Sequence, residues 1–321
     1  MKVRLLVLFI LSFSVLCFSQ TPVTMSADWQ INNTLTGSCY AGCYNPATDH
    51  FLVSVAGAAV NIYSGSDGSD TATTLNVSSV PISGLGIFGM GATVDGVIYA
   101  YNDGDGGLYR WDNESAATAT VALAGASFAR TMDVHGTGVN TIIALIGSGI
   151  SFPIDILGTT DGLTFTLLDQ TAGIAKNGGA VNDALDKAWG TPDCPGAIPL
   201  HAIKSGGVWA TESTVWLPPG AATGSTIMDY DDRGDILVAC NPNTSPRTII
   251  ALDGTSGSLS ASVDDTTVAT NGVNCYGGLY IDKANGKVYY TQRGVAPDVN
   301  MGRLTYTPLL PTKALDWSVY E

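Results

Sequence analysis

The stretch Gly37–Val53 reads GSCYAGCYNPATDHFLV, and a similar unit, VNCYGGLYIDKANGKVY, returns at Val273–Tyr289. Both copies contain Cys-Tyr-x-Gly-x-Tyr, then a turn with Asn or Asp, then a run of β-branched and aromatic residues. A unit that occurs near both ends of a chain indicates a repeat architecture. The fold class therefore follows from how often this unit recurs in between.

Short β-type runs continue the repeat through the chain. They begin at residues 51, 97, 142, 188, 236 and 288, which gives spacings of 46, 45, 46, 48 and 52. A strand of small residues and an Asx/Gly turn precede each run, and two further short strands follow most of them. Because one four-stranded sheet cannot bury both faces alone, we expect six such sheets to pack radially. The sequence predicts an all-β, six-bladed β-propeller. A seven-bladed propeller or another repetitive β architecture is the alternative.

The two ends of the chain carry a related signal. Asp28-Trp29 lies where the outermost strand of a preceding blade would sit, and Asp316-Trp317 occupies the same place in the sixth blade. We therefore expect the termini to meet in the last blade, with the identity of the edge strand left open.

The N-terminus has the pattern of a secretory signal peptide. Lys2 and Arg4 precede an almost wholly apolar run, Leu5–Phe18, and small residues allow cleavage before Gln20. We expect residues 1–19 to be the signal peptide, residues 20–321 to form a single β-propeller domain, and the protein to be secreted, periplasmic or extracellular, without membrane insertion.

The charge balance limits the partners. With 14 basic and 28 acidic residues the net charge is −14, which argues against nucleic acid and against anionic membrane surfaces. It is compatible with calcium, neutral glycans or an extracellular protein partner. The oligomeric state is left open.

The cysteine count suggests crosslinks. In the repeat register Cys39 and Cys275 fall at one position of neighbouring blades, and Cys194 and Cys240 both follow a second strand. Export permits disulfides, so we expect Cys39–Cys275 and Cys194–Cys240, with Cys43 free and buried. Five reduced, packed cysteines are the alternative.

The blade pattern resembles the large superfamily of secreted bacterial propellers. Tyr44–Thr48 (Tyr-Asn-Pro-Ala-Thr) and Ile281–Lys287 (Ile-Asp-Lys-Ala-Asn-Gly-Lys) carry the likeness. Such superfamilies include lyases, lactonases, quinoprotein dehydrogenases and binding scaffolds. The resemblance therefore implies a fold and no particular activity.

Two acidic segments are candidate cation sites. In Asn102–Gly107, oxygen-bearing side chains alternate with glycines, so Asp103 and Asp105, with Glu114 from the following loop, could hold calcium. An acidic hairpin turn explains the same residues, since Asp-Gly favours turns. Asp229–Asp232, with Asp235, is a second acidic cluster.

Histidines and aromatic residues give no clear catalytic set. His50 and His135 fall in expected turns and His201 on an expected third strand, and we interpret the turn histidines as surface residues. Trp209, Trp216 and Tyr230 are candidates for a sugar-stacking surface, with core packing as the ordinary alternative.

The sequence thus favours a secreted, non-catalytic binding or scaffold protein with its ligand at a mouth of the ring. An extracellular hydrolase or lyase acting on a glycan or lactone, and a surface or adhesion protein, are the alternatives. Inward carboxylates joined by a metal or a histidine at one mouth would favour the enzyme. No catalytic residue is identified from sequence.

Overall fold

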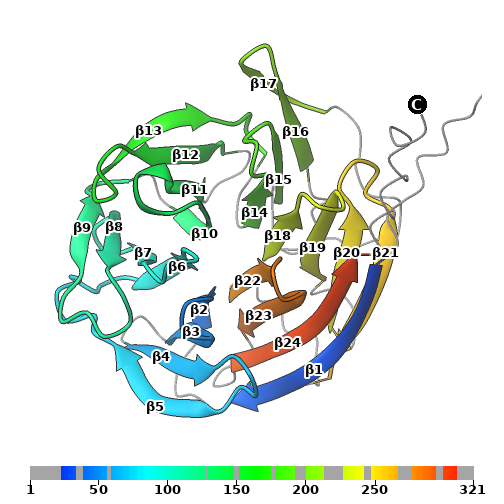
Figure 1. Cartoon of the computed structure of the whole chain (residues 1–321). Helices are drawn as coiled ribbons and strands as arrows, with labels where there is room; N and C mark the ends of the chain where they lie inside the picture. The colour runs from blue at the N-terminus through cyan, green and yellow to red at the C-terminus, as the bar shows by residue number, and fades with distance from the viewer. Residues whose placement is uncertain are drawn as a thin grey trace, which may run out of the picture.

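The computed structural model describes residues 23–33, 39–55, 59–126, 129–147, 152–174, 178–191, 200–212, 227–241, 247–266, 277–293 and 299–308. These residues form six four-stranded antiparallel sheets arranged as the blades of a ring (Figure 1). The predicted six-bladed propeller is confirmed. In the described part of the chain, no helix is long and apolar enough to cross a membrane.

Each of the first five blades is built from four consecutive strands, the first of which lies nearest the axis (Figure 1). The strands of these blades are, in chain order, β2 (Cys39–Asn45), β3 (His50–Val55), β4 (Ala59–Ser64) and β5 (Asp70–Leu75); β6 (Ile87–Ala92), β7 (Ile98–Asn102), β8 (Gly107–Trp111) and β9 (Thr120–Leu123); β10 (Ala129–His135), β11 (Ile142–Gly147), β12 (Ile154–Thr159) and β13 (Phe165–Gln170); β14 (Gly178–Val181), β15 (Lys187–Thr191), β16 (Leu200–Ser205) and β17 (Val208–Thr211); β18 (Met228–Asp231), β19 (Ile236–Asn241), β20 (Arg247–Asp253) and β21 (Leu259–Asp265).

The sixth blade closes the ring with both ends of the described chain. Its order is β22 (Gly277–Asp282), β23 (Lys287–Arg293), β24 (Val299–Pro308) and then β1 (Val23–Asn33) as the outermost strand. The first strand (blue) runs beside the last (red) in Figure 1. The expectation that the N-terminal segment joins the last blade is confirmed; Asp316-Trp317 lies outside the described residues.

A polar cluster fixes this closure. Asp28 of β1 accepts hydrogen bonds from Lys287 Nζ at 2.8 Å and from Arg303 Nε at 2.8 Å. Thr305 Oγ1 donates to the same carboxylate at 2.6 Å. Although burial opposes it, these partners hold the pKa of Asp28 below its usual value. The ring is therefore locked by charge-assisted bonds between strands that are distant in sequence.

Small residues on the innermost strands let the sheets converge. A Cβ placed on Gly278 of β22 would lie 1.9 Å from the Gly42 carbonyl of β2, and one on Gly89 of β6 would lie 3.3 Å from the Thr131 backbone of β10. Larger side chains have no room there. Further out the blades bury aromatic side chains, including Trp111 and Trp189, each 0% exposed.

Candidate functional site

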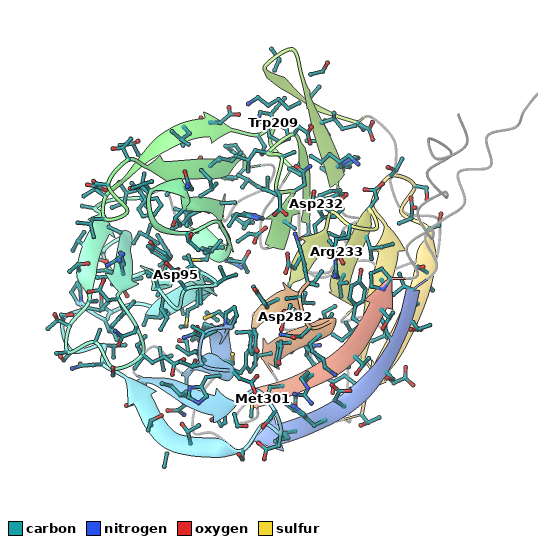
Figure 2. The ribbon with its side chains drawn as sticks, viewed as in Figure 1. Asp95, Trp209, Asp232, Arg233, Asp282 and Met301 are labelled. Carbon is teal, nitrogen blue, oxygen red and sulfur yellow. The ribbon has the colours of Figure 1, made fainter. Side chains whose placement is uncertain are left out.

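A cavity of about 480 Å³ lies on the axis, at the mouth where the innermost strands end and turn into the second strands. The third and sixth blades contribute several lining residues, the fourth and fifth contribute one carboxylate each, and the first and second contribute one apolar residue each. Figure 2 shows Asp232, Arg233 and Asp282 near the central opening. The residues that line the cavity are Pro46, Val94, Asp133, Val134, His135, Gly136, Asp183, Asp229 and Tyr280 to Asn285.

Asn and Asp side chains shape the turns at this mouth. Asn45 Oδ1 accepts a hydrogen bond from Ala47 N at 3.1 Å, and Asn182 Oδ1 accepts one from Lys187 N at 2.8 Å. Asp231 and Asp282 accept equivalent bonds from Arg233 N and Ala284 N. An Asx at the end of the innermost strand thus organises the turn in four blades.

The third blade departs from this rule, because His135 stands where those blades have Asn or Asp. The turn after it is longer and contains a short 3₁₀ segment, Gly138–Asn140. The His135 side chain contacts Asp133 and Asp183 instead of the following turn, and it lines the axial cavity. The expectation that His135 is a surface turn residue is wrong, because it ends an inner strand.

Two carboxylates hold the His135 ring. Its Nε2 lies 3.0 Å from Asp133 Oδ2 and its Nδ1 lies 2.9 Å from Asp183 Oδ1. Burial disfavours the charged ring, but the negative charges of Asp133 and Asp183 outweigh it and raise the pKa of His135 to about 10. At neutral pH His135 is therefore an imidazolium, which has no free nitrogen lone pair and cannot act as a general base.

Lys283 continues the network around the rim. Its Nζ lies 3.0 Å from Asp183 Oδ2 and 3.2 Å from Asp232 Oδ2, which joins blades six, four and five. Burial opposes the charge, yet the Asp183 hydrogen bond and the neighbouring carboxylates raise the pKa of Lys283. The rim from the third to the sixth blade is therefore one chain of alternating charges.

Asp229 lies at the floor of the cavity. It is 8% exposed and lines both the axial cavity and a smaller chamber of about 20 Å³ next to it, as do Asp133 and Tyr280. Its carboxylate accepts hydrogen bonds from Tyr230 N at 2.7 Å and from Ile281 N at 2.6 Å. Burial and the Asp133 charge nevertheless raise the pKa of Asp229 to about 7.

The opposite side of the cavity is less polar. Pro46 and Val94 line it from the first two blades, and the Val94 side chain is 65% exposed. Because the carboxylates around the cavity outnumber the cations of His135 and Lys283, the site disfavours anions. It suits a small neutral molecule that is polar on one side.

The calcium candidates lie apart from this cavity and in separate hydrogen-bond networks. Asp103 Oδ2 accepts Leu85 N at 3.0 Å, Asp105 accepts Asn102 Nδ2 at 2.7 Å, and Glu114 Oε1 accepts Asn45 Nδ2 at 2.7 Å. Glu114 also lies 2.6 Å from His50 Nδ1. Within the described ranges, no group of three or more His, Cys, Asp or Glu side chains is arranged to hold a metal ion. Calcium binding stays a prediction.

Two of the proposed sugar-stacking residues, Trp209 and Tyr230, lie in different blades. Tyr230 is 3% exposed and stacks on Trp189 at 4.1 Å between ring centroids. Trp209 lies on the outermost strand β17 (Figure 2) and donates from Nε1 to Asp169 Oδ2 at 2.9 Å. Trp216 lies outside the described residues. Tyr230 therefore serves the packing between the fourth and fifth blades.

Three of the five cysteines that follow the expected signal peptide, Cys39, Cys43 and Cys240, lie in the described part of the chain. Cys43 is buried and free, as expected. Cys39 is also buried and lies 3.4 Å from Thr291 Oγ1. The two proposed disulfides stay predictions, because Cys194 and Cys275 lie outside the described residues.

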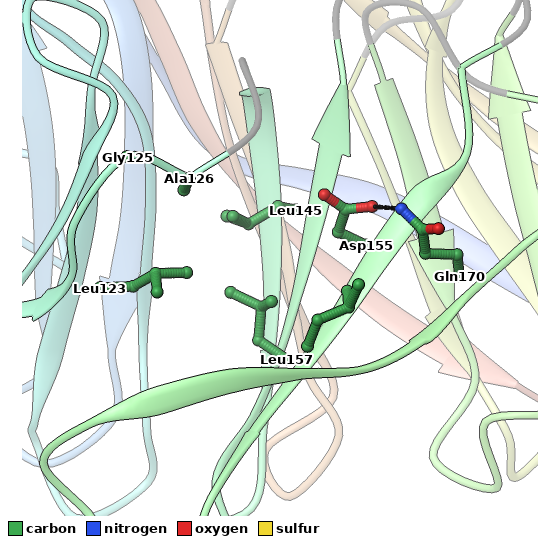
Figure 3. A pocket seen from close by; sticks show the side chains of 8 residues that line it. Leu123, Gly125, Ala126, Leu145, Asp155, Leu157 and Gln170 are labelled. Atoms are coloured by element: carbon green, nitrogen blue, oxygen red, sulfur yellow. Dashed lines mark hydrogen bonds between the residues drawn. The ribbon is translucent and has the colours of Figure 1, made fainter.

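A second cavity of about 200 Å³ lies between the outer strands of the second and third blades (Figure 3). Leucines make up half of the residues that line it, and the carboxylate of Asp155 accepts a hydrogen bond from Gln170 Nε2 at 2.7 Å. A single satisfied carboxylate offers little chemistry, so the axial cavity is the candidate site.

The way the repeats are aligned with one another explains why the sequence alone does not single out the axial residues. Asp133, Asp229 and Tyr280 each lie two residues before the end of an innermost strand. The Cys-Tyr-x-Gly-x-Tyr motif instead matches Tyr280 with Tyr44, which lies one residue further along its strand. Alignment on the strand ends would have placed these three side chains at one level of the ring.

Comparison with known proteins supports the fold. A gluconolactonase from Xanthomonas campestris has a structure similar to this chain, with a TM-score of 0.57 and 12% sequence identity, over 85% of this chain and 88% of that one. No protein-family model matches the sequence. No curated protein matches it either. At this identity the likeness shows the propeller fold alone, without a specific family.

Proposed function

We propose that the protein is a secreted hydrolase that opens a small, neutral cyclic ester in the axial cavity, with Asp229 as the general base. The observation that carries the proposal is the convergence of Asp133, Asp229, His135 and Lys283 at one mouth of the ring. Such inward carboxylates with a histidine are the feature that separates the enzyme from a passive scaffold. The structural similarity to a gluconolactonase is in keeping with this choice.

Asp229 has the proton affinity that the reaction needs. A base with a pKa near the working pH is ionised in a useful fraction of molecules and still accepts a proton readily. Asp229 is the carboxyl whose pKa is raised to about 7, and it lies on the cavity floor. Asp133 beside it is held ionised by His135, because the pKa of Asp133 is lowered by that partner despite burial.

The charge balance suits the direction of the reaction. A neutral lactone enters an acidic cavity without electrostatic cost, whereas the hydroxy acid formed from it is an anion and is repelled. The weakly polar side formed by Pro46 and Val94 can receive the carbon skeleton of the ring.

The test is lactone hydrolysis followed by base consumption in a pH-stat, with a panel of neutral γ- and δ-lactones. The wild type is expected to hydrolyse at least one of them. Asp229→Asn should lower the rate by about 100-fold or more, as loss of a general base does. Asp112→Asn is the matched control, since Asp112 is 72% exposed on the second blade. Equal rates for Asp229→Asn and wild type would remove the base assignment.

A non-catalytic binding protein is the second candidate. The ion pairs of His135 and Lys283 with carboxylates favour it, because a charge that is already paired in the protein has no evident role in catalysis. In that case a lactone or a related polyol would raise the thermal midpoint by mass action without being consumed.

A further inference from the structure

We infer that Tyr280 is a second catalytic residue of the axial site and donates a hydrogen bond from its hydroxyl to the substrate's carbonyl oxygen. This inference rests on the proposed hydrolytic function and names the group that stabilises the negative charge formed during the reaction. The basis is a comparison of the three hydrogen-bond donors that line the cavity, His135, Lys283 and Tyr280.

The two cations of the cavity are committed to protein partners. His135 has a carboxylate at 3.0 Å on one ring nitrogen and at 2.9 Å on the other. Lys283 Nζ lies between two carboxylates at 3.0 and 3.2 Å. The charge of His135 is thus paired with Asp133 and Asp183, although its Nε2 makes no aligned hydrogen bond, and the charge of Lys283 is paired with Asp183 and Asp232.

Tyr280 is differently placed. It is only partly buried and lines both the 480 Å³ cavity and the 20 Å³ chamber beside it. Its ring packs against Tyr44, with centroids 5.5 Å apart, which fixes the side chain from one side. Over the ranges that the structure describes, its hydroxyl has no hydrogen-bond partner in the protein. The phenol is thus an uncommitted donor on the cavity wall.

The backbone brings this donor next to the base. Ile281 N, the amide directly after Tyr280, donates to Asp229 Oδ2 at 2.6 Å. Burial and the charges of Asp229, Asp282 and Asp133 raise the pKa of Tyr280. The hydroxyl therefore stays protonated over the pH range in which Asp229 titrates, so donor and base are in their working forms together.

The chamber of about 20 Å³ suits the second reactant. It exceeds the 10–15 Å³ or so that one water molecule needs, and a buried water also requires polar partners. Asp133, Asp229 and Tyr280 supply these among otherwise apolar walls. A water held there has Asp229 beside it and the open cavity in front of it.

The reaction balances with these groups alone. Water oxygen bonds to the carbonyl carbon while Asp229 takes its proton, and the electron pair of the C=O bond moves to oxygen, where the Tyr280 O–H stabilises it. The pair then re-forms the C=O bond, the ring C–O bond breaks, and Asp229 returns the proton to the ring oxygen. The product is a hydroxy acid, and Tyr280 keeps its proton throughout.

Tyr280→Phe tests the inference, because it removes only the hydroxyl and keeps the ring that packs on Tyr44. With the lactone that the wild type hydrolyses fastest, we expect kcat to fall by about 100-fold, with KM changed by less than about threefold. The rise of kcat/KM with pH should keep its midpoint, since Asp229 is untouched. Tyr63→Phe, a buried tyrosine of the first blade, is the matched control and should behave as wild type.

The outcomes separate the two proposals. An active wild type with Tyr280→Phe within threefold of it overturns the role of Tyr280 and leaves the hydrolase standing. A wild type that hydrolyses no lactone overturns both. Thermal unfolding of each variant checks that the fold is kept; if Tyr280→Phe is unfolded, Tyr280→Leu, which has no donor in its side chain, must show the same loss of kcat.

Discussion

Asp229 should make the protein less stable as the pH rises, and replacement by Asn should remove that dependence. In the unfolded chain the carboxyl titrates near its ordinary value of 3.8, whereas in the fold its pKa is about 7. Between these values the native state binds the extra proton, so stability is greatest below about pH 4 and is lost as the pH rises through 7. A difference of about three pKa units corresponds to roughly 4 kcal/mol.

The comparison of two pH values isolates this effect. Asn at position 229 loses one of the two backbone hydrogen bonds, at a cost of about 1–3 kcal/mol that does not depend on pH. Urea unfolding of wild type and Asp229→Asn at pH 4.5 and pH 8 measures the free energy of unfolding of each protein. The free energy of unfolding of the variant, relative to that of the wild type, should be higher at pH 8 than at pH 4.5 by on the order of 3 kcal/mol. Asp112→Asn should track the wild type at both.

An unchanged difference between the two pH values would refute the reasoning. It would mean that Asp229 is ionised in the native state at pH 4.5, and that neither burial nor Asp133 governs its titration. The general-base assignment would then lose its basis as well.

Other expectations concern the rest of the ring. Asp28→Asn should destabilise the protein by about 1–3 kcal/mol, because Lys287 and Arg303 lose their shared carboxylate. Since the pKa of Asp28 is lowered in the fold, the stability difference between wild type and variant should vanish as the pH falls below about 4. Unfolding measured over an acid titration checks this. His135→Gln should lower stability at pH 6 more than at pH 10.5, because a pKa raised to about 10 stabilises the fold below 6.5 and ceases to do so as the pH passes 10; an equal loss at both would contradict the ion-pair assignment. Native Cys43 should resist iodoacetamide, since burial raises its pKa; rapid labelling, mapped by peptide mass, would count against its burial. Calcium should raise the thermal midpoint if Asp103, Asp105 and Glu114 bind it, and the midpoint of Asp105→Asn should then not respond.

The fold was predictable because its signals are local and repeat. Turn residues and β-branched runs recur at 45–52 residues, and the expected second strands beginning at residues 51, 142 and 236 lie within one residue of β3, β11 and β19. The same repeat register predicts the Asp28-Trp29 segment in the last blade. Only the order of β1 outside β24 had to come from the three-dimensional pairing.

The site was not predictable in the same way, because it depends on register across blades. In the sequence Asp229 is one member of an acidic run, and nothing local distinguishes it from Asp231, which pairs with Arg233 at 2.7 Å. Asp133 and His135 come from a blade that lacks the Asn or Asp found at the end of the innermost strand in four other blades. Lys283 lies in a turn, and nothing in the sequence distinguishes it from other turn lysines. Their proximity arises from ring closure, which brings strands about 50 to 150 residues apart to one axis.

The most direct measurement of the central claim is the pH dependence of kcat/KM for lactone hydrolysis by the wild-type protein between pH 5 and 9. The account predicts a rise that levels off, with a midpoint near pH 7 from Asp229, and no such rise in Asp229→Asn. Hydrolysis that is independent of pH over this range, or absent for every neutral lactone, would contradict it.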